Sequence, residues 1–69
     1  MREITRKLKR IIESGDARMI LLEDDQGRVL LEISPDLSFL KSTLNLVKGI
    51  TKTVKNCKLI VTKKQLLFN

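Results

Sequence analysis

The stretch ARMILLEDDQGRVLLEIS, residues 17–34, decides the fold of this 69-residue chain. Two apolar runs, RMILLE and RVLLEI, flank the acidic gap DDQG, and a proline follows at once. A gap of three to five residues that contains glycine, between two such runs, indicates a β-hairpin. We therefore predict a hairpin over residues 18–33, with Gly27 at positive φ in its turn. The first run is apolar at four consecutive positions, which predicts a strand covered on both faces.

Upstream of the hairpin, residues 3–14 have the period of an amphipathic helix. The apolar positions that share one helical face are Ile4, Leu8, Ile11 and Ile12. Gly15 follows where a helix C-cap glycine belongs.

Downstream, Ser34 and Pro35 match the start signal of a helix, a serine N-cap followed by proline at the first position. The helical period then continues, so we predict a helix over residues 35–54. Its apolar positions cover an arc of about 180°, wider than the usual core-facing stripe. Asn56 is a terminator, and residues 57–63 have the composition of a strand.

These elements predict a single domain over residues 1–69 with an α+β fold. The order is α-β-β-α-β, and a small three-stranded, mainly antiparallel sheet packs with the two helices. The last strand is expected at an edge of the sheet. Residues 64–69 either extend that strand or fold back as a short final element.

The small size of the domain favours self-association. A chain of this length buries only about 60% of the surface that it exposes when unfolded. Cys57 is the only cysteine and histidine is absent, so neither an intrachain disulfide nor a structural zinc site is available. The lone cysteine, the absence of an apolar run of membrane-spanning length and the lack of a signal-peptide pattern together predict a cytoplasmic protein with no membrane partner.

Charge is distributed unevenly along the chain, whose formal net charge is +6. Residues 1–13 and 37–69 are strongly basic, and residues 37–69 contain seven lysines and no acid. Residues 14–36, which include the hairpin, are acidic. This asymmetry can attract a polyanion, or it can bring the acidic part of one copy to the basic part of another.

Parts of the sequence resemble an uncharacterised family of small bacterial domains, with an LLEIP-like segment and a closing Cys-basic-Ile-x-Val strand. The resemblance extends over roughly residues 15–62. The matching positions are Arg18, Ile20, Leu22, Gly27, Arg28, Leu30, Leu31, Glu32, Ile33, Pro35, Cys57, Ile60 and Val61. The middle departs from the family, which has a small-residue apolar stretch where this chain has a lysine-striped helix. The resemblance implies a fold and no particular activity.

The residue types argue against an enzyme. Without histidine the commonest general base is missing, and no Ser–His or Cys–His pair can form. Glu23, Asp24 and Asp25 cluster at the hairpin tip, where we interpret them as solvated turn residues. Cys57, beside Lys58, could have a lowered pKa, but its alternation with apolar residues favours a small core side chain. No cofactor, metal or small-molecule substrate is indicated.

Two functions stay open. The first is a self-associating or protein-interaction module, favoured by the wide apolar arc and the edge strand. The second is binding of nucleic acid or another polyanion through the basic helices. Its candidate residues are Arg6, Lys9, Arg10, Lys41, Lys48, Lys52 and Lys55. The two phenylalanines, Phe39 and Phe68, fall in apolar contexts and are expected to be packed, so no exposed aromatic platform for bases is predicted.

Overall fold

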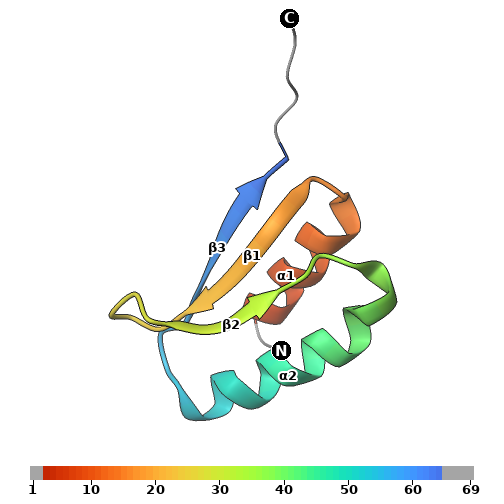
Figure 1. The fold of residues 1–69 in the computed structure, drawn as a ribbon. Coiled ribbons are helices and arrows are strands. Elements are labelled where there is room, and N and C mark those ends of the chain that lie inside the picture. Colours follow the sequence, from red (N-terminus) through yellow and green to blue (C-terminus); the bar gives the residue numbers. More distant parts are fainter. Residues whose placement is uncertain (1–2, 65–69) are drawn as a thin grey trace, which may run out of the picture.

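The computed structural model describes residues 3–64, in which two α-helices pack on a three-stranded sheet (Figure 1). The order helix, strand, strand, helix, strand confirms the predicted α+β fold class. In chain order the elements are α1 (Glu3–Ser14), β1 (Ala17–Glu23), β2 (Val29–Ile33), the short 3-10 helix η1 (Leu37–Phe39), α2 (Leu40–Thr53) and β3 (Lys58–Lys63). The end of the chain beyond Lys64, and with it the question of a strand extension, lies outside the described residues.

The sheet has the order β2-β1-β3, with both pairs antiparallel. Cross-strand partners share a face, so the register defines two rows on the helix side. These rows are Ile33–Ile20–Val61 and Leu31–Leu22–Leu59. Within the described sheet, β2 and β3 are therefore edge strands, and each has one side without a strand partner. The prediction that the last strand lies at an edge is confirmed.

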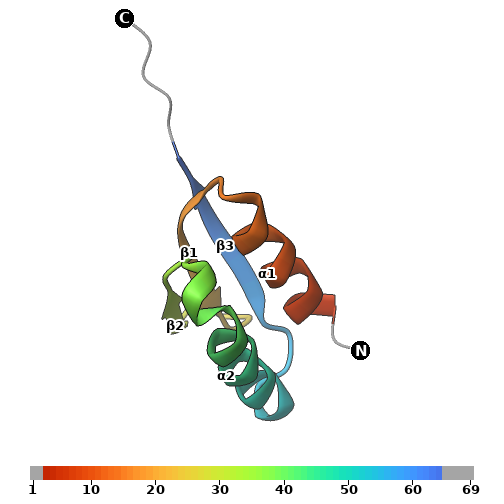
Figure 2. The same cartoon turned by 90° about the vertical axis from the view of Figure 1, so that its right-hand side faces the viewer.

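Both helices lie on one face of the sheet and form a two-layer sandwich (Figure 2). The core is the set of apolar side chains at most 3% exposed, namely Leu8, Ile12, Ala17, Ile20, Leu22, Ile33 and Val47. It joins α1, β1, β2 and α2, and the apolar residues of β3 pack around it. At both expected glycine positions the backbone has positive φ, 75° at Gly15 and 82° at Gly27.

The outer face of the sheet is open, which corrects the prediction that the first strand is covered on both faces. Met19 on β1 is 45% exposed and Ile60 on β3 is 39% exposed. The four consecutive apolar positions reflect the central place of β1, because Leu21 is half-buried between Glu32 and Ile60 of its two neighbours. A central strand loses exposed surface to both flanking strands even without a second layer.

The second helix starts later than predicted. Asp36 is the N-cap of η1, and its carboxylate accepts hydrogen bonds from the Ser38 backbone N–H (3.0 Å) and hydroxyl (2.8 Å). The prediction of a Ser34 cap with Pro35 as the first helical residue is wrong. Instead the Asp36 N–H donates to the Ser34 carbonyl (2.8 Å), so Pro35 lies in a tight turn. Two N-cap candidates stand close together, and the carboxylate, a strong acceptor, caps the first helical turn.

Both ends of α1 and the ends of β2 and β3 fall at the predicted residues, and three other boundaries differ by one residue. β1 starts at Ala17, α2 ends at Thr53, and β3 starts at Lys58. Asn56 has a φ of 62°, a left-handed conformation that ends regular structure between α2 and β3.

Candidate functional site

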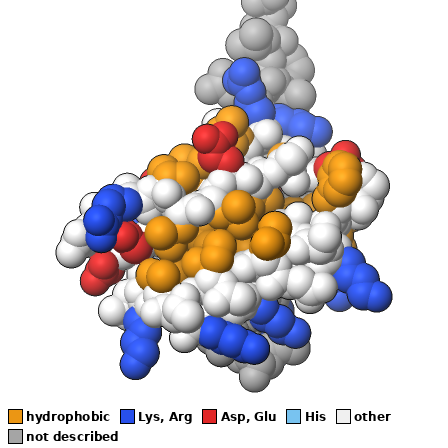
Figure 3. Space-filling view, turned by 60° about the horizontal axis from the view of Figure 1, so that its bottom comes forward, with side chains coloured by type: hydrophobic (Ala, Val, Ile, Leu, Met, Phe, Trp, Pro, Cys, Tyr) orange, Lys and Arg blue, Asp and Glu red, His pale blue; other side chains and the backbone are white. Residues whose placement is uncertain are grey.

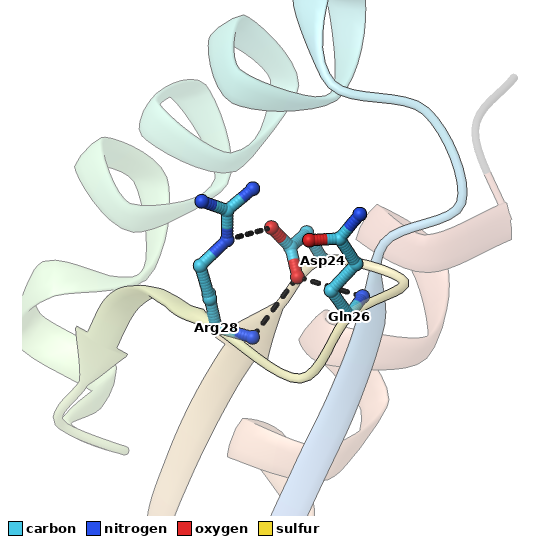
Figure 4. A network of polar contacts seen from close by, with 3 residues as sticks. All are labelled: Asp24, Gln26 and Arg28. Atoms are coloured by element: carbon cyan, nitrogen blue, oxygen red, sulfur yellow. Dashed lines mark hydrogen bonds and ion pairs between the residues drawn. The ribbon is translucent and has the colours of Figure 1, made fainter.

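The hairpin tip is a closed polar network centred on Asp24 (Figure 4). Asp24 Oδ1 accepts hydrogen bonds from the backbone N–H groups of Gln26 and Arg28, each at 2.9 Å. Its other oxygen, Oδ2, accepts from Arg28 Nε at 3.1 Å, which makes an ion pair across the turn. The backbone adds bonds from the Asp24 N–H to the Arg28 carbonyl and from the Gly27 N–H to the Asp24 carbonyl. Asp24 therefore holds the loop together.

This network corrects the interpretation of Asp24 as a solvated turn residue, because the residue is only 7% exposed. Hydrogen bonds from the Arg28 backbone, the Gln26 backbone and the Arg28 side chain together hold the pKa of the Asp24 carboxyl below its ordinary value, against the effect of burial. Both oxygens are occupied by donors of the loop itself. The role of Asp24 is structural, while Asp25 beside it is exposed.

Cys57 is half-buried just before β3, and its thiol donates to the Val54 carbonyl at 3.3 Å. Burial raises the pKa of this thiol, and the negative charges of Asp24 and Asp25 add to the effect. Proximity to Lys58 in the sequence does not lower it. A raised pKa gives little thiolate at neutral pH, so the geometry fits the packing role rather than a nucleophile.

An apolar groove lies between edge strand β2 and helix α2, and we name it the β2–α2 groove. Its apolar lining is Leu31, Ile33, Phe39 and Leu46, and the residues around them are Glu32, Ser34, Ser42 and Thr43. Figure 3 shows a large gathering of apolar side chains on this side of the molecule, with the charged side chains around its margins. Phe39 is 58% exposed and Leu46 is 57% exposed.

These exposures confirm that the apolar arc of the second helix is wider than the domain can cover. Val47 alone of α2 is fully enclosed, and Leu40, Leu44 and Ile50 are partly buried against the core. The prediction that Phe39 is packed is wrong, because this residue precedes α2 and its side chain lies beside the β2 edge, where the core does not cover it. Phe68 lies outside the described residues.

The seven predicted polyanion-binding residues are all exposed, but they do not converge on one site. Arg6 and Arg10 lie on α1 along a groove beside β3, which Lys9 does not line. By helical period, Lys41, Lys48 and Lys52 lie on the side of α2 away from Leu46, and Lys55 follows the end of that helix. None of the seven takes part in an ion pair within residues 3–64.

The groove beside β3, which we name the α1–β3 groove, consists of two adjoining hollows of about 590 and 470 Å³. Lys7 and Arg10 line both hollows. The apolar floor is Ile4, Ile11, Leu59 and Val61, and the cationic rim is Arg6, Lys7, Arg10, Lys58 and Lys63. All three rim lysines, Lys7, Lys58 and Lys63, are absent from the seven predicted residues. The sequence does not group Lys7 with Lys58 and Lys63, because only the packing of α1 next to β3 brings these three residues together.

The described residues offer no metal centre, since no group of three or more Cys, Asp or Glu side chains within 3–64 could hold an ion. Neither α1 nor α2 has the length and apolar character to cross a lipid bilayer.

No match was found when the chain was compared with known protein families, with curated proteins and with solved structures. The resemblance to the family of small bacterial domains therefore stays a prediction.

Proposed function

We propose that this chain is a non-enzymatic interaction domain that associates with a second copy of itself through the β2–α2 groove. The observation that carries the proposal is the exposure of Phe39 and Leu46, each more than half accessible although both side chains are large and apolar. They lie together beside an unpaired strand edge. Contiguous apolar surface of this kind on a small domain is typical of an interaction site.

Charge favours a second copy as the occupant. Each chain has a net charge of +6, so two copies repel each other over most of their surfaces. The β2–α2 groove is the exception, because among residues 3–64 only one charged residue, Glu32, lines it. The α2 lysines lie on the other side of their helix, so copies that meet at the groove keep them apart. A twofold arrangement would bury the same surface of both copies.

Sedimentation velocity over a range of protein concentrations tests the proposal. We expect a reversible dimer that weakens by at least about tenfold in the double variant Phe39→Ser/Leu46→Ser, because central apolar contacts dominate most interfaces. The matched control is Met19→Thr, which removes a similarly exposed apolar side chain from the open sheet face. A monomer at every concentration would refute the proposal. A dimer that only Met19→Thr weakens would move the interface to the sheet.

Salt separates this proposal from the second candidate. Added salt screens the repulsion between two copies of charge +6, so self-association through this mainly apolar groove should stay constant or strengthen. Binding that depends on phosphate contacts weakens steeply as salt rises.

The second candidate is polyanion binding by the helical layer. It is supported by the exposure of all seven predicted basic side chains. Within the described residues, none of the seven forms an ion pair with a carboxylate. The double variant Lys48→Gln/Lys52→Gln should reduce retention of a short single-stranded oligonucleotide and flatten its salt dependence. The same variant should leave a groove-mediated dimer intact. An oligonucleotide that is not retained by the wild-type protein would exclude this candidate.

The absence of histidine from the sequence and the internal use of the Asp24 carboxylate both support a non-enzymatic role. The half-buried Cys57 thiol donates to the Val54 carbonyl, and the sequence has no histidine that could activate it as a nucleophile. A lone cysteine suits the reducing cytoplasm, where we propose that the domain acts.

A further inference from the structure

We infer that the α1–β3 groove is a second binding site, which takes an extended acidic peptide segment of a partner protein as an added strand along β3. This site lies at the opposite edge of the sheet from the β2–α2 groove and is independent of self-association there.

The edge of β3 that faces away from β1 can accept a further strand. Within the described sheet, β3 pairs only with β1, so on alternate residues its backbone N–H and C=O groups point away from the sheet. An extended peptide can satisfy them by adding a strand. β3 has six residues, a length of about 20 Å at roughly 3.3 Å per residue, enough for a partner segment of six or seven residues.

The floor of the groove offers apolar surface to a bound peptide. Leu59 and Val61 of β3 point to the helix side but are only half-buried, because α1 does not cover the strand completely. Ile4 and Ile11 of α1 complete the apolar floor. Alternate side chains of an added strand would point to this same side and contact the floor.

The positively charged rim of the groove favours a negatively charged ligand. Five cations surround the groove, namely Arg6, Lys7, Arg10, Lys58 and Lys63. Two acids, Glu3 and Asp16, also line it, which leaves an excess of three positive charges. None of the five cations forms an ion pair within the described part of the chain. An acidic segment is therefore the complementary partner.

The same lysines disfavour a second β3 strand as the occupant. In an antiparallel pair of β3 edges, Lys58 of one copy would come close to Lys63 or Lys64 of the other, and like charges at such positions are destabilising. Lysines on an edge strand commonly prevent edge-to-edge pairing of identical chains. Nucleic acid is also disfavoured, because no aromatic side chain of residues 3–64 lines the groove to stack on a base.

A fluorescently labelled seven-residue peptide with blocked ends, Glu-Thr-Val-Thr-Glu-Thr-Val, tests the inference by fluorescence anisotropy, because its Glu and Val side chains share the face that an added strand would turn to the helix side. We expect saturable binding to the wild-type protein that weakens about tenfold or more in Lys7→Glu/Arg10→Glu, since both attractions become repulsions. Lys7→Gln/Arg10→Gln should lose less peptide affinity than Lys7→Glu/Arg10→Glu, because it removes the attraction without adding repulsion. The control Lys48→Glu/Lys52→Glu changes the net charge equally on α2, outside the groove, and should change binding less than about threefold.

Two N-methylated versions of the peptide separate strand addition from attraction by charge alone. Each is methylated at one of the two sets of alternate amides, and only one set faces β3 in an added strand. We expect one version to lose binding and the other to retain it. Loss of binding by neither version, or equal weakening in the α2 control, would overturn the inference.

Competition decides between the ligand classes. A single-stranded oligonucleotide that displaces the peptide at lower concentration than the unlabelled peptide itself would reassign the groove to nucleic acid. Melting temperatures check that all variants fold, which we expect because the substituted side chains are exposed. Sedimentation of Lys7→Glu/Arg10→Glu should match the wild type, so failure of this inference is distinguishable from failure of self-association.

Discussion

Two adjacent residues of α2 allow a direct test of the packing, because they differ completely in burial. Val47 is 0% exposed, whereas Leu46, next to it in the sequence, is 57% exposed. Truncation of each to alanine leaves the helix backbone unchanged. The comparison therefore measures mainly what each side chain contacts in the folded domain.

The expected magnitudes follow from burial. Val47→Ala removes two methylene-sized groups from the core, about 0.8 kcal/mol each, and leaves a cavity, so we expect a loss of about 2–3 kcal/mol in the free energy of unfolding. Leu46→Ala removes a side chain that is less than half buried, a loss of about 1 kcal/mol at most. The higher helix propensity of alanine offsets a few tenths of a kcal/mol of the loss in both variants. The difference of about 2 kcal/mol corresponds to roughly 8–16 °C in melting temperature for a domain of this size.

Thermal and urea unfolding at protein concentrations where the domain is monomeric provide the measurement. Dilution matters because self-association stabilises the folded state in a concentration-dependent way. At high concentration we expect Leu46→Ala to lose the concentration dependence of the melting temperature. Equal destabilisation by both variants in the monomer would refute the reasoning, because it would mean that Leu46 is packed within a single chain.

Further predictions concern the turns, the pH dependence and the thiol. Gly27→Ala should lower the free energy of unfolding by about 1 kcal/mol, because φ at this position is 82°. Gly49→Ala should raise it by about 0.5–1 kcal/mol, because Gly49 lies in α2 and nothing lies within 4 Å of the added methyl group. Thermal unfolding of both variants measures the two effects. The lowered pKa values of Asp24 and Asp36 mean that the stability they contribute is present above about pH 4, the unfolded value, and is lost as pH falls through the folded values. Melting temperatures between pH 6 and 2 should therefore fall less in Asp24→Asn/Asp36→Asn than in the wild type, and parallel curves would contradict this. Cys57 should react with a disulfide reagent at pH 7.5 more slowly than a cysteine in an unstructured peptide, because its pKa is raised; an equal or faster rate would show that the thiol is neither buried nor hydrogen-bonded in solution.

Local patterns accounted for most of the architecture. The apolar period predicted α1 to the residue, and the glycine-containing gap predicted the hairpin with Gly27 at positive φ. Both signals depend on interactions within about ten residues, which a single sequence displays. The start of the second helix was missed for a local reason, since Ser34 and Asp36 are both good N-caps and the hydrogen bonds of Asp36 prevail.

The candidate sites were only partly predictable. The wide apolar arc of the second helix indicated surplus apolar surface, and the exposure of Leu46 agrees with it. The exposed position of Phe39 was not foreseen, because an aromatic residue within an apolar run has the pattern of a core residue whether or not anything covers it. The basic residues were recognised as a set, but Arg6 and Arg10 are separated from the α2 lysines by the packing of the helices.

The sequence by itself determined the elements, their order, the fold class and the distribution of charge, because these depend on local periodicity, turn chemistry and composition. Only the tertiary structure decided that β1 is central, that one sheet face stays open and that β2 and β3 each border a groove. The pairing of β1 with β3 brings together residues about forty positions apart, such as Ile20 and Val61. No local pattern in the sequence shows which edge of the hairpin the last strand pairs with. The cationic rim of the α1–β3 groove follows from that selection, because Lys7 meets Lys58 only after β3 has paired with β1 beside α1.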